Sequence, residues 1–271
     1  MKISILDNVL TTIGLETESV GIAFSGGGAR GFSHVGVILA LEKFGITPRI
    51  ISGVSAGAIA AALYGAGLNA KEILECFADY SKFTSFTEWS IPTEGILKLN
   101  KFEKILSGWL PVRNLEEMKI PTVICATDID SGKSVGFTKG AIAKRVAASC
   151  SIPVIFQPVK INGVNYVDGG VLRNLPAWAI REHCKTLIGS NCSPLDRDYS
   201  YKKSLLSIAT RTFQLMAKSN VINDIKLCDY VIQNPQLSKY STFNISDSDD
   251  IVRRGYDAAC RTLETAFKSR K

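Results

Sequence analysis

Short apolar runs and longer amphipathic stretches alternate along most of the chain. The apolar runs show no polar alternation, which is typical of strands buried on both faces of a parallel sheet. They are Val20–Phe24, Ile50–Ser52, Ile120–Thr127, Thr186–Asn191 and Tyr230–Gln233. The stretches between them favour helices. These are Phe32–Phe44, Ala56–Ala66, Ala70–Tyr80, Ala141–Cys150, Pro176–Cys184, Lys202–Asn220 and Ile251–Lys268. The alternation predicts an α/β fold with a mainly parallel sheet.

Two polar turns predict hairpins within this pattern. Asn162-Gly163 favours a tight type I′ turn, which joins Val159–Ile161 to Val164–Val167. Asp128–Lys133 resembles a calcium-binding loop only in part, because it lacks the closing glutamate and further ligand positions. We therefore interpret it as a hairpin turn that leads into a returning strand.

No linker, internal repeat or low-complexity segment divides the 271 residues. We expect a single domain over residues 1–271, with a motif-bearing core at about 20–190 and a C-terminal helical part at about 200–271. Residues 81–115 mix aromatic and polar side chains without a clear period, although a short helix is expected near Lys101–Leu110. This segment is interpreted either as a cap over a pocket or as ordinary core packing.

The composition is that of a folded protein, with 46% hydrophobic and 21% charged residues. No apolar run is long enough to cross a bilayer, and residues 1–18 lack the sustained apolar core of a signal peptide. A cytoplasmic location is therefore expected. The seven cysteines are an odd number without C-x-x-C pairs, which favours reduced thiols over a disulfide framework or a zinc site.

The formal net charge is +7, and basic residues recur in the last third of the chain. No nucleic-acid-binding motif accompanies them, and no basic stripe is interleaved with aromatic residues, so no nucleic-acid partner is expected. Peripheral contact with an anionic membrane surface fits the charge equally well. A solvated basic surface without a partner is the remaining interpretation.

The turn Gly53-Val54-Ser55-Ala56-Gly57 connects a β-branched strand to a helix of small residues. This G-x-S-x-G pattern is typical of a nucleophile elbow, in which a sharp turn exposes the serine hydroxyl at the edge of a sheet. The following helix N-terminus favours an anion beside Ser55. The simpler interpretation is a glycine-rich turn that only lets the strand meet the helix closely.

The loop Gly26–Gly31 matches G-x-G-x-x-G between a strand and a helix, which raises the possibility of a dinucleotide site. The second strand lacks the acidic residue that binds ribose, and Phe32 and Ser33 stand where a P-loop requires Lys-Ser/Thr. The loop fits an oxyanion hole better, because Gly26, Gly27 and Gly28 leave backbone N–H groups open to a carbonyl oxygen. Arg30 could anchor the loop, contact an anionic head group or be a surface charge.

Ser55 requires a base, and three residues are candidates. Asp168 ends a predicted strand, and the following Gly169-Gly170 leaves its surroundings open. His183 follows Asp168 in the chain order of a Ser–Asp–His triad, but it lies at the end of an expected helix. His34 lies one turn into a helix, where a buried, hydrogen-bonded imidazole is the simpler role. Asp168 is the preferred base, with a Ser–Asp–His esterase using His183 as the alternative.

These motifs resemble, in order and context, those of the patatin-like phospholipases. The resemblance rests on Gly26–Gly31, Gly53–Gly57 and Asp168–Gly170, together with Ala148–Pro153 and Asn174–Pro176. It covers about residues 21–176 and is closest to bacterial cytoplasmic members. Gly170 stands where many members have alanine.

The resemblance implies a three-layer α/β/α fold and hydrolysis of lipid acyl esters without a metal or cofactor. It implies a Ser–Asp dyad of Ser55 and Asp168, with Gly26, Gly27 and Gly28 as the oxyanion hole. The supporting motif residues are Arg30, Gly31, Gly53, Gly57, Gly169 and Gly170. The expected activity is that of a phospholipase A, lysophospholipase or carboxylesterase acting through an acyl-enzyme. A non-catalytic lipid-binding protein on the same fold is the alternative, although the intact motifs speak against it.

Overall fold

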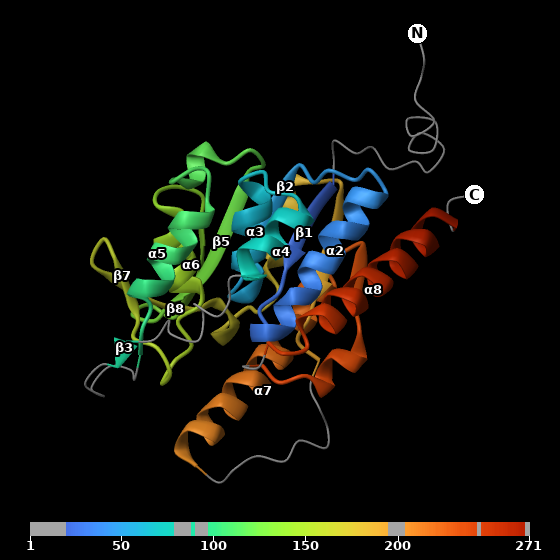
Figure 1. Ribbon diagram of the computed structural model, residues 1–271. Helices are drawn as coiled ribbons and strands as arrows, with labels where there is room; N and C mark the ends of the chain where they lie inside the picture. Colours follow the sequence, from blue (N-terminus) through green and yellow to red (C-terminus); the bar gives the residue numbers. More distant parts are fainter. Residues whose placement is uncertain (1–19, 79–87, 90–96, 195–203, 243–244, 269–271) are drawn as a thin grey trace.

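A computed structural model describes residues 20–78, 88–89, 97–194, 204–242 and 245–268 (Figure 1). Its central sheet has the strand order β10-β9-β1-β2-β5-β8-β7, and β6 pairs with the other edge of β5. The strands that pair in parallel are β1 (Val20–Phe24), β2 (Ile50–Gly53), β5 (Thr122–Asp128), β9 (Thr186–Asn191) and β10 (Tyr230–Gln233). The predicted α/β fold with a mainly parallel sheet is confirmed.

One end of the sheet is antiparallel. β6 (Lys133–Phe137) and β8 (Val164–Asp168) both run against β5, and β7 (Val159–Ile161) runs against β8. The short turns predicted from sequence produce this arrangement, because a tight hairpin can connect only antiparallel strands. Asn162 and Gly163 have φ values of 51° and 91°, as a type I′ turn requires.

Alternate side chains along the parallel strands enter two cores. Ile22 and Phe24 face a large core, whereas Ala23 between them faces a smaller one. The large core is covered by helices on one face of the sheet (Figure 1). These are α2 (Phe32–Lys43), α3 (Ala56–Gly65), α4 (Ala70–Ala78), α5 (Asn100–Trp109), α6 (Ile142–Ser149) and α8 (Ser248–Lys268).

The opposite face is covered by shorter elements and one long helix. The expected helix Pro176–Cys184 is instead two 3₁₀ turns, η6 (Pro176–Ala179) and η7 (Arg181–His183). A single α-helix does not form because the backbone at Ile180, with φ −133° and ψ −2°, departs from helical geometry between them. Helix α7 (Leu205–Ile225) packs Val221 into the smaller core, and Figure 1 shows α7 in orange projecting from the body of the molecule. The two helical layers complete a three-layer α/β/α fold.

The interpretation of residues 81–115 as a cap is tested only in part. Residues 79–87 and 90–96 lie outside the described residues. A two-stranded hairpin, β3 (Glu88–Trp89) and β4 (Leu97–Lys98), precedes α5. Phe102 and Leu106 of α5 are buried in the large core, so this part of the segment contributes to packing. No helix in the described part of the chain is long and apolar enough to span a bilayer.

Candidate active site

Ser55 occupies a strained turn between β2 and α3. Its backbone has φ 54° and ψ −123°, a conformation that non-glycine residues rarely adopt and that surrounding structure must hold in place. The Ser55 N–H donates to the Ser149 hydroxyl at 2.8 Å, and that hydroxyl donates to the Cys125 carbonyl at 2.6 Å. The turn is therefore fixed to both α6 and β5.

The glycine at the end of G-x-S-x-G is required by close packing. A Cβ atom on Gly57 would lie 2.2 Å from the Phe24 carbonyl oxygen, and one on Gly53 would lie 2.3 Å from the Gly57 carbonyl oxygen. Since backbone atoms form these contacts, the structure cannot relieve them by moving a side chain. The start of α3 therefore lies directly against the end of β1.

The register of the sheet brings Asp168 to the level of Ser55. Gly53 on β2 pairs with Ile124 on β5, and two residues further along β5 Ala126 pairs with Asp168 on β8. Ser55 likewise lies two residues beyond Gly53. Because β8 is antiparallel to β5, Asp168 reaches this level as the last residue of its strand.

Asp168 is fully buried. Its Oδ1 atom accepts a hydrogen bond from the Gly170 N–H at 2.8 Å, which caps the short 3₁₀ turn η5 (Gly169–Val171). Burial raises the pKa of the carboxyl to about 7, although interactions with the Ser55 hydroxyl and the Gly170 N–H act in the opposite direction. Within the described residues, Asp168 Oδ2 has no partner at regular hydrogen-bond geometry. This atom is available to receive a proton.

The glycine-rich loop follows β1 and turns into α2. The Gly26 N–H donates to the Asn174 carbonyl at 3.1 Å, so it cannot also serve an oxyanion. This bond leaves Gly27 and Gly28 as the better-placed donors of the three glycines. The N–H groups of Gly27 and Gly28 make no hydrogen bond within the described residues, and both glycines line a cavity with Ser55 and Asp168.

Gly28 has a φ of 59°, and a Cβ atom there would lie 2.3 Å from the Thr242 carbonyl oxygen. Arg30 is buried and donates to the carbonyls of Pro194, Ser238 and Tyr240 at 2.7–3.2 Å. Of the roles considered for Arg30, the structure matches the anchor of the loop. Gly31 packs against Ala56 at the start of α3.

His34 lies beneath the glycine-rich loop as a neutral, fully buried imidazole. Burial lowers its pKa to about 4, although its hydrogen bond to Ser25 raises it. Nε2 lies 2.8 Å from the Ser25 carbonyl oxygen, which can only accept, so Nε2 carries the proton. Nδ1 then accepts from the Ser190 hydroxyl at 2.8 Å. His34 supports the backbone before Gly26 and faces neither Ser55 nor Asp168.

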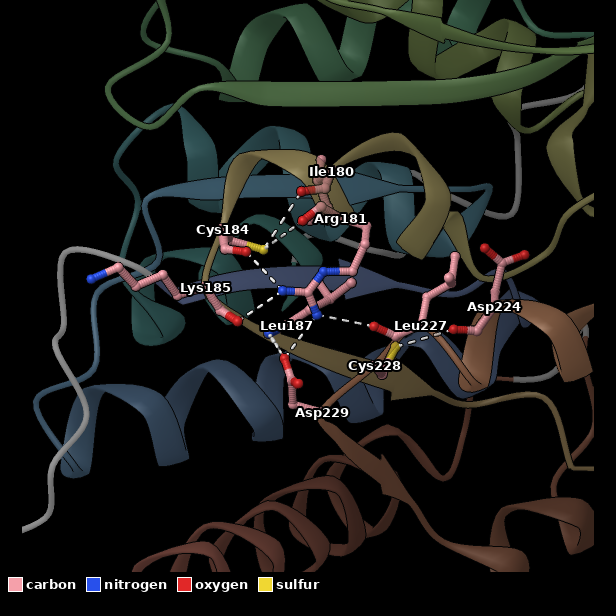
Figure 2. Close-up of polar contacts among 9 residues, drawn as sticks. All are labelled: Ile180, Arg181, Cys184, Lys185, Leu187, Asp224, Leu227, Cys228 and Asp229. Atoms are coloured by element: carbon pink, nitrogen blue, oxygen red, sulfur yellow. Dashed lines mark hydrogen bonds and ion pairs between the residues drawn. The ribbon is translucent and has the colours of Figure 1, made fainter.

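His183 lies at the wrong end of the sheet for a triad. It is an exposed residue of η7, which precedes β9, whereas Ser55 follows the end of the parallel strand β2. Figure 2 shows the Arg181 guanidinium fixing this region. Arg181 binds the Leu227 carbonyl and the Asp229 carboxylate before β10, and the Cys184 and Lys185 carbonyls before β9. The structure therefore does not bring His183 together with Ser55 and Asp168.

Two cavities meet at Ser55. One has a volume of about 220 Å³ and an apolar lining that includes Phe32, Val35, Ile59, Phe77 and Phe156. The other is smaller, at about 40 Å³, and has a more polar lining. Its lining includes Gly27, Asp168, Asn174, Ser193, Thr210 and Gln214. None of the described residues 97–115 lines either cavity.

Sequence patterns did not indicate the residues that α7 and the segment near Thr242 contribute to these cavities. Asn174 was noted only as part of a motif, yet its side chain donates to Ser193 Oγ at 2.9 Å and to the Gly26 carbonyl at 3.3 Å. No cluster of three or more metal-ligating side chains occurs in the portion of the chain that the structure covers.

A family model described as patatin-like phospholipase matches residues 22–180. An uncharacterized NTE family protein of Mycobacterium tuberculosis is 33% identical over 169 residues, which are 60% of this chain and 46% of that protein. Lysophospholipase NTE1 of Meyerozyma guilliermondii is 25% identical over 94% of this chain and 20% of its own length. The chain thus spans less than half the length of these curated relatives.

Two solved structures share the fold. VipD from Legionella pneumophila has a TM-score of 0.53 at 15% identity, with 93% of this chain and 67% of VipD covered. Human GIVD cytosolic phospholipase A2 has a TM-score of 0.50 at 12% identity, with 97% of this chain and 63% of that chain covered.

Proposed function

The chain belongs to the patatin-like phospholipase family, and from that premise we propose that it hydrolyses lipid acyl esters with Ser55 as nucleophile and Asp168 as general base. One observation carries the proposal. A serine in a strained turn shares a cavity with a fully buried carboxyl group and with the N–H groups of Gly27 and Gly28, which make no hydrogen bond among the described residues. These are the groups that acyl transfer requires.

In the first step Ser55 Oγ attacks the ester carbonyl carbon, and its proton passes to Asp168 Oδ2. The carbonyl oxygen gains negative charge and is stabilised by the Gly27 and Gly28 N–H groups. The carbon–oxygen bond to the leaving alcohol then breaks, and the alcohol takes the proton from Asp168. In the second step Asp168 accepts a proton from water, the water oxygen attacks the acyl-enzyme, and the proton returns to Ser55 as the fatty acid leaves.

The two cavities suggest how an ester would be oriented. The larger, apolar cavity suits the acyl chain, because burial of its methylene groups is favourable. The smaller, more polar cavity suits the leaving alcohol, next to the Asp168 carboxyl that protonates it. Lipid esters, with an apolar acyl group and a polar alcohol, match this pair of environments.

We expect labelling by a fluorophosphonate to test the nucleophile. Such a probe phosphonylates an activated serine, so the protein should gain one probe mass, mapped by peptide mass spectrometry to Ser55, and lose hydrolysis of a chromogenic medium-chain ester in proportion. His183→Ala should label and hydrolyse like the wild type, because His183 lies outside the site. Ester hydrolysis without labelling of Ser55 would contradict the mechanism. Neither labelling nor hydrolysis would favour the non-catalytic lipid-binding protein.

A pH profile tests the base. Asp168 accepts a proton only when ionised, and burial raises its pKa to about 7. The value of kcat/KM should therefore rise with pH through about 7, and at pH 5 it should be about 100-fold below its plateau. Measurements with a non-ionising ester and with circular dichroism at each pH separate this effect from unfolding. A flat profile between pH 5 and 8 would show that no group with such a pKa acts as base.

A further inference from the structure

Helix α7 carries an unusual concentration of exposed apolar side chains. Among the described residues, eight large hydrophobic side chains are exposed, and six of them lie on α7. These are Leu205, Leu206, Ile208, Leu215, Met216 and Ile222, with exposed fractions of 38–80%. A patch of this kind on a folded protein is typical of an interaction site.

Five of the six exposed side chains form one face of the helix. At about 100° per residue, Leu205, Ile208, Leu215, Met216 and Ile222 fall within a single stripe. The buried residues Ala217, Val221 and Asp224 lie on the opposite side. The helix therefore has two apolar sides, one packed against the protein and one exposed to solvent. We call the exposed stripe the outer face of α7.

The other side of α7 is tied to the candidate active site. The Asn220 side chain donates to the Gly170 carbonyl at 2.8 Å and accepts from the Asn174 N–H at 2.8 Å. Thr210, Phe213 and Gln214 line the smaller cavity. The helix thus forms a wall of that cavity, with the outer face on its opposite side.

The charges of α7 favour an anionic surface. Residues 204–223 include Arg211 and Lys218 but no aspartate or glutamate. The acidic residue that follows, Asp224, is fully buried and paired with Arg173 at 2.8 Å. Arg211 and Lys218 lie along one border of the outer face, and Lys226 is exposed at the end of the helix. An apolar helix face bordered by cations is the pattern of helices that lie in the interface of an anionic bilayer.

We propose that the outer face of α7 docks on an anionic lipid bilayer and lays the helix in its interfacial region. A second copy of this chain is the less favoured occupant, because Arg211 and Lys218 would then face an equally basic surface. The docking places the helix that forms a wall of the smaller cavity against the lipid. The docking rests on the proposed function only where the lipid is treated as a source of substrate. Binding to the bilayer itself requires no hydrolysis.

Vesicle sedimentation with the full chain tests the docking. Vesicles of phosphatidylcholine with 30 mol% phosphatidylglycerol and vesicles of phosphatidylcholine alone are compared, and Ser55→Ala is the background so that no lipid is consumed. We expect Ile208→Gln/Leu215→Gln/Ile222→Gln to weaken binding to the anionic vesicles by at least about tenfold, since three apolar contacts are lost. Ile129→Gln is the matched control, because Ile129 is 50% exposed in the hairpin turn after β5 and should change nothing.

The charge component has its own variant. Arg211→Gln/Lys218→Gln should weaken binding to the anionic vesicles by about fivefold per charge and should leave the weak binding to neutral vesicles unchanged. Equal binding by all variants would overturn the proposal. Light scattering that finds a wild-type dimer and a monomeric triple variant, with unchanged vesicle binding, would assign the outer face to a second copy instead.

A soluble short-chain ester keeps the two proposals distinct. With the native Ser55 restored and no vesicles present, the triple variant should hydrolyse this ester at the wild-type rate, because the three replaced side chains face away from the cavities. Docking without hydrolysis would support the outer face as a membrane contact and contradict the proposed function. Hydrolysis of the soluble ester without binding to vesicles would support the proposed function and contradict the membrane contact.

Discussion

Replacement of Ser55 by alanine is expected to lower kcat for a chromogenic ester by about 10⁵-fold, because the hydroxyl that forms the acyl-enzyme is lost. Alanine removes only the hydroxyl and leaves the hydrogen bond from the residue 55 N–H to Ser149 in place. The melting temperature should therefore stay close to that of the wild type. Steady-state hydrolysis, with circular dichroism as the check on folding, measures both effects.

Ser52→Ala is the matched control. Ser52 is a buried serine three residues earlier, and its hydroxyl donates to the Pro176 carbonyl at 2.8 Å, away from the cavities. We expect this variant to lose about 1 kcal/mol of stability but to retain turnover within a few-fold. Turnover that survives in Ser55→Ala would eliminate the proposed mechanism. An equal loss in both variants would show that the assay reports folding and not chemistry.

Asp168→Asn is expected to give a more stable but inactive protein. Asparagine has the same shape and can still accept the Gly170 N–H, but it cannot take a proton from Ser55 or water. We expect kcat to fall by about 10⁴-fold. The gain in stability arises because the wild type must hold an ionised carboxyl in a buried position at high pH.

The sign of this stability effect follows from proton linkage. In the folded protein the pKa of Asp168 is raised from 3.8 to about 7, so between these values the folded state holds a proton that the unfolded state has released. Wild-type stability therefore falls as pH rises from about 4 to 7. This loss approaches about 4 kcal/mol at pH 8 and falls below about 1 kcal/mol at pH 4, where the folded carboxyl is protonated and the unfolded one is only about half ionised.

Denaturant unfolding of both proteins at pH 4 and pH 8 measures the difference directly. Asp168→Asn should be more stable than the wild type at pH 8, and the two should converge at pH 4. A wild type that is the more stable protein at pH 8 would mean that the ionised carboxyl is well solvated or paired. In that case the raised pKa, and with it the expected pH profile, would be wrong.

Local patterns were sufficient to predict the parts of the site that depend on backbone geometry. The G-x-S-x-G turn predicted its own sharp backbone because Gly57 must pass the end of β1 without a side chain. Asn162-Gly163 predicted a hairpin because few other residues adopt positive φ at both positions. The alternation of apolar runs and amphipathic stretches was enough to predict the layers of the fold.

Features that depend on distant segments could not be predicted. The occupied Gly26 N–H depends on a carbonyl at residue 174, and no local pattern encodes that contact. The helix expected over Pro176–Cys184 failed because tertiary packing of η6 and η7 against the sheet overrides local helical preference. The roles of Gly27, Gly28 and Asp168, and the single-domain organisation, stay predictions.

The segments that follow residue 180 hold the motif region in shape. The Ala29 N–H donates to the Thr242 carbonyl at 2.8 Å, and Asn220 holds the turn that follows Asp168. A protein cut after residue 180 would retain Ser55, Asp168 and every glycine of the three motifs. It would lose the hydrogen bonds with Thr242 and Asn220 that hold these motifs in position. Motif content and catalytic competence are therefore different properties in this fold. A fragment chosen for expression or grafting only because it matches the family would contain the motifs without being catalytically competent.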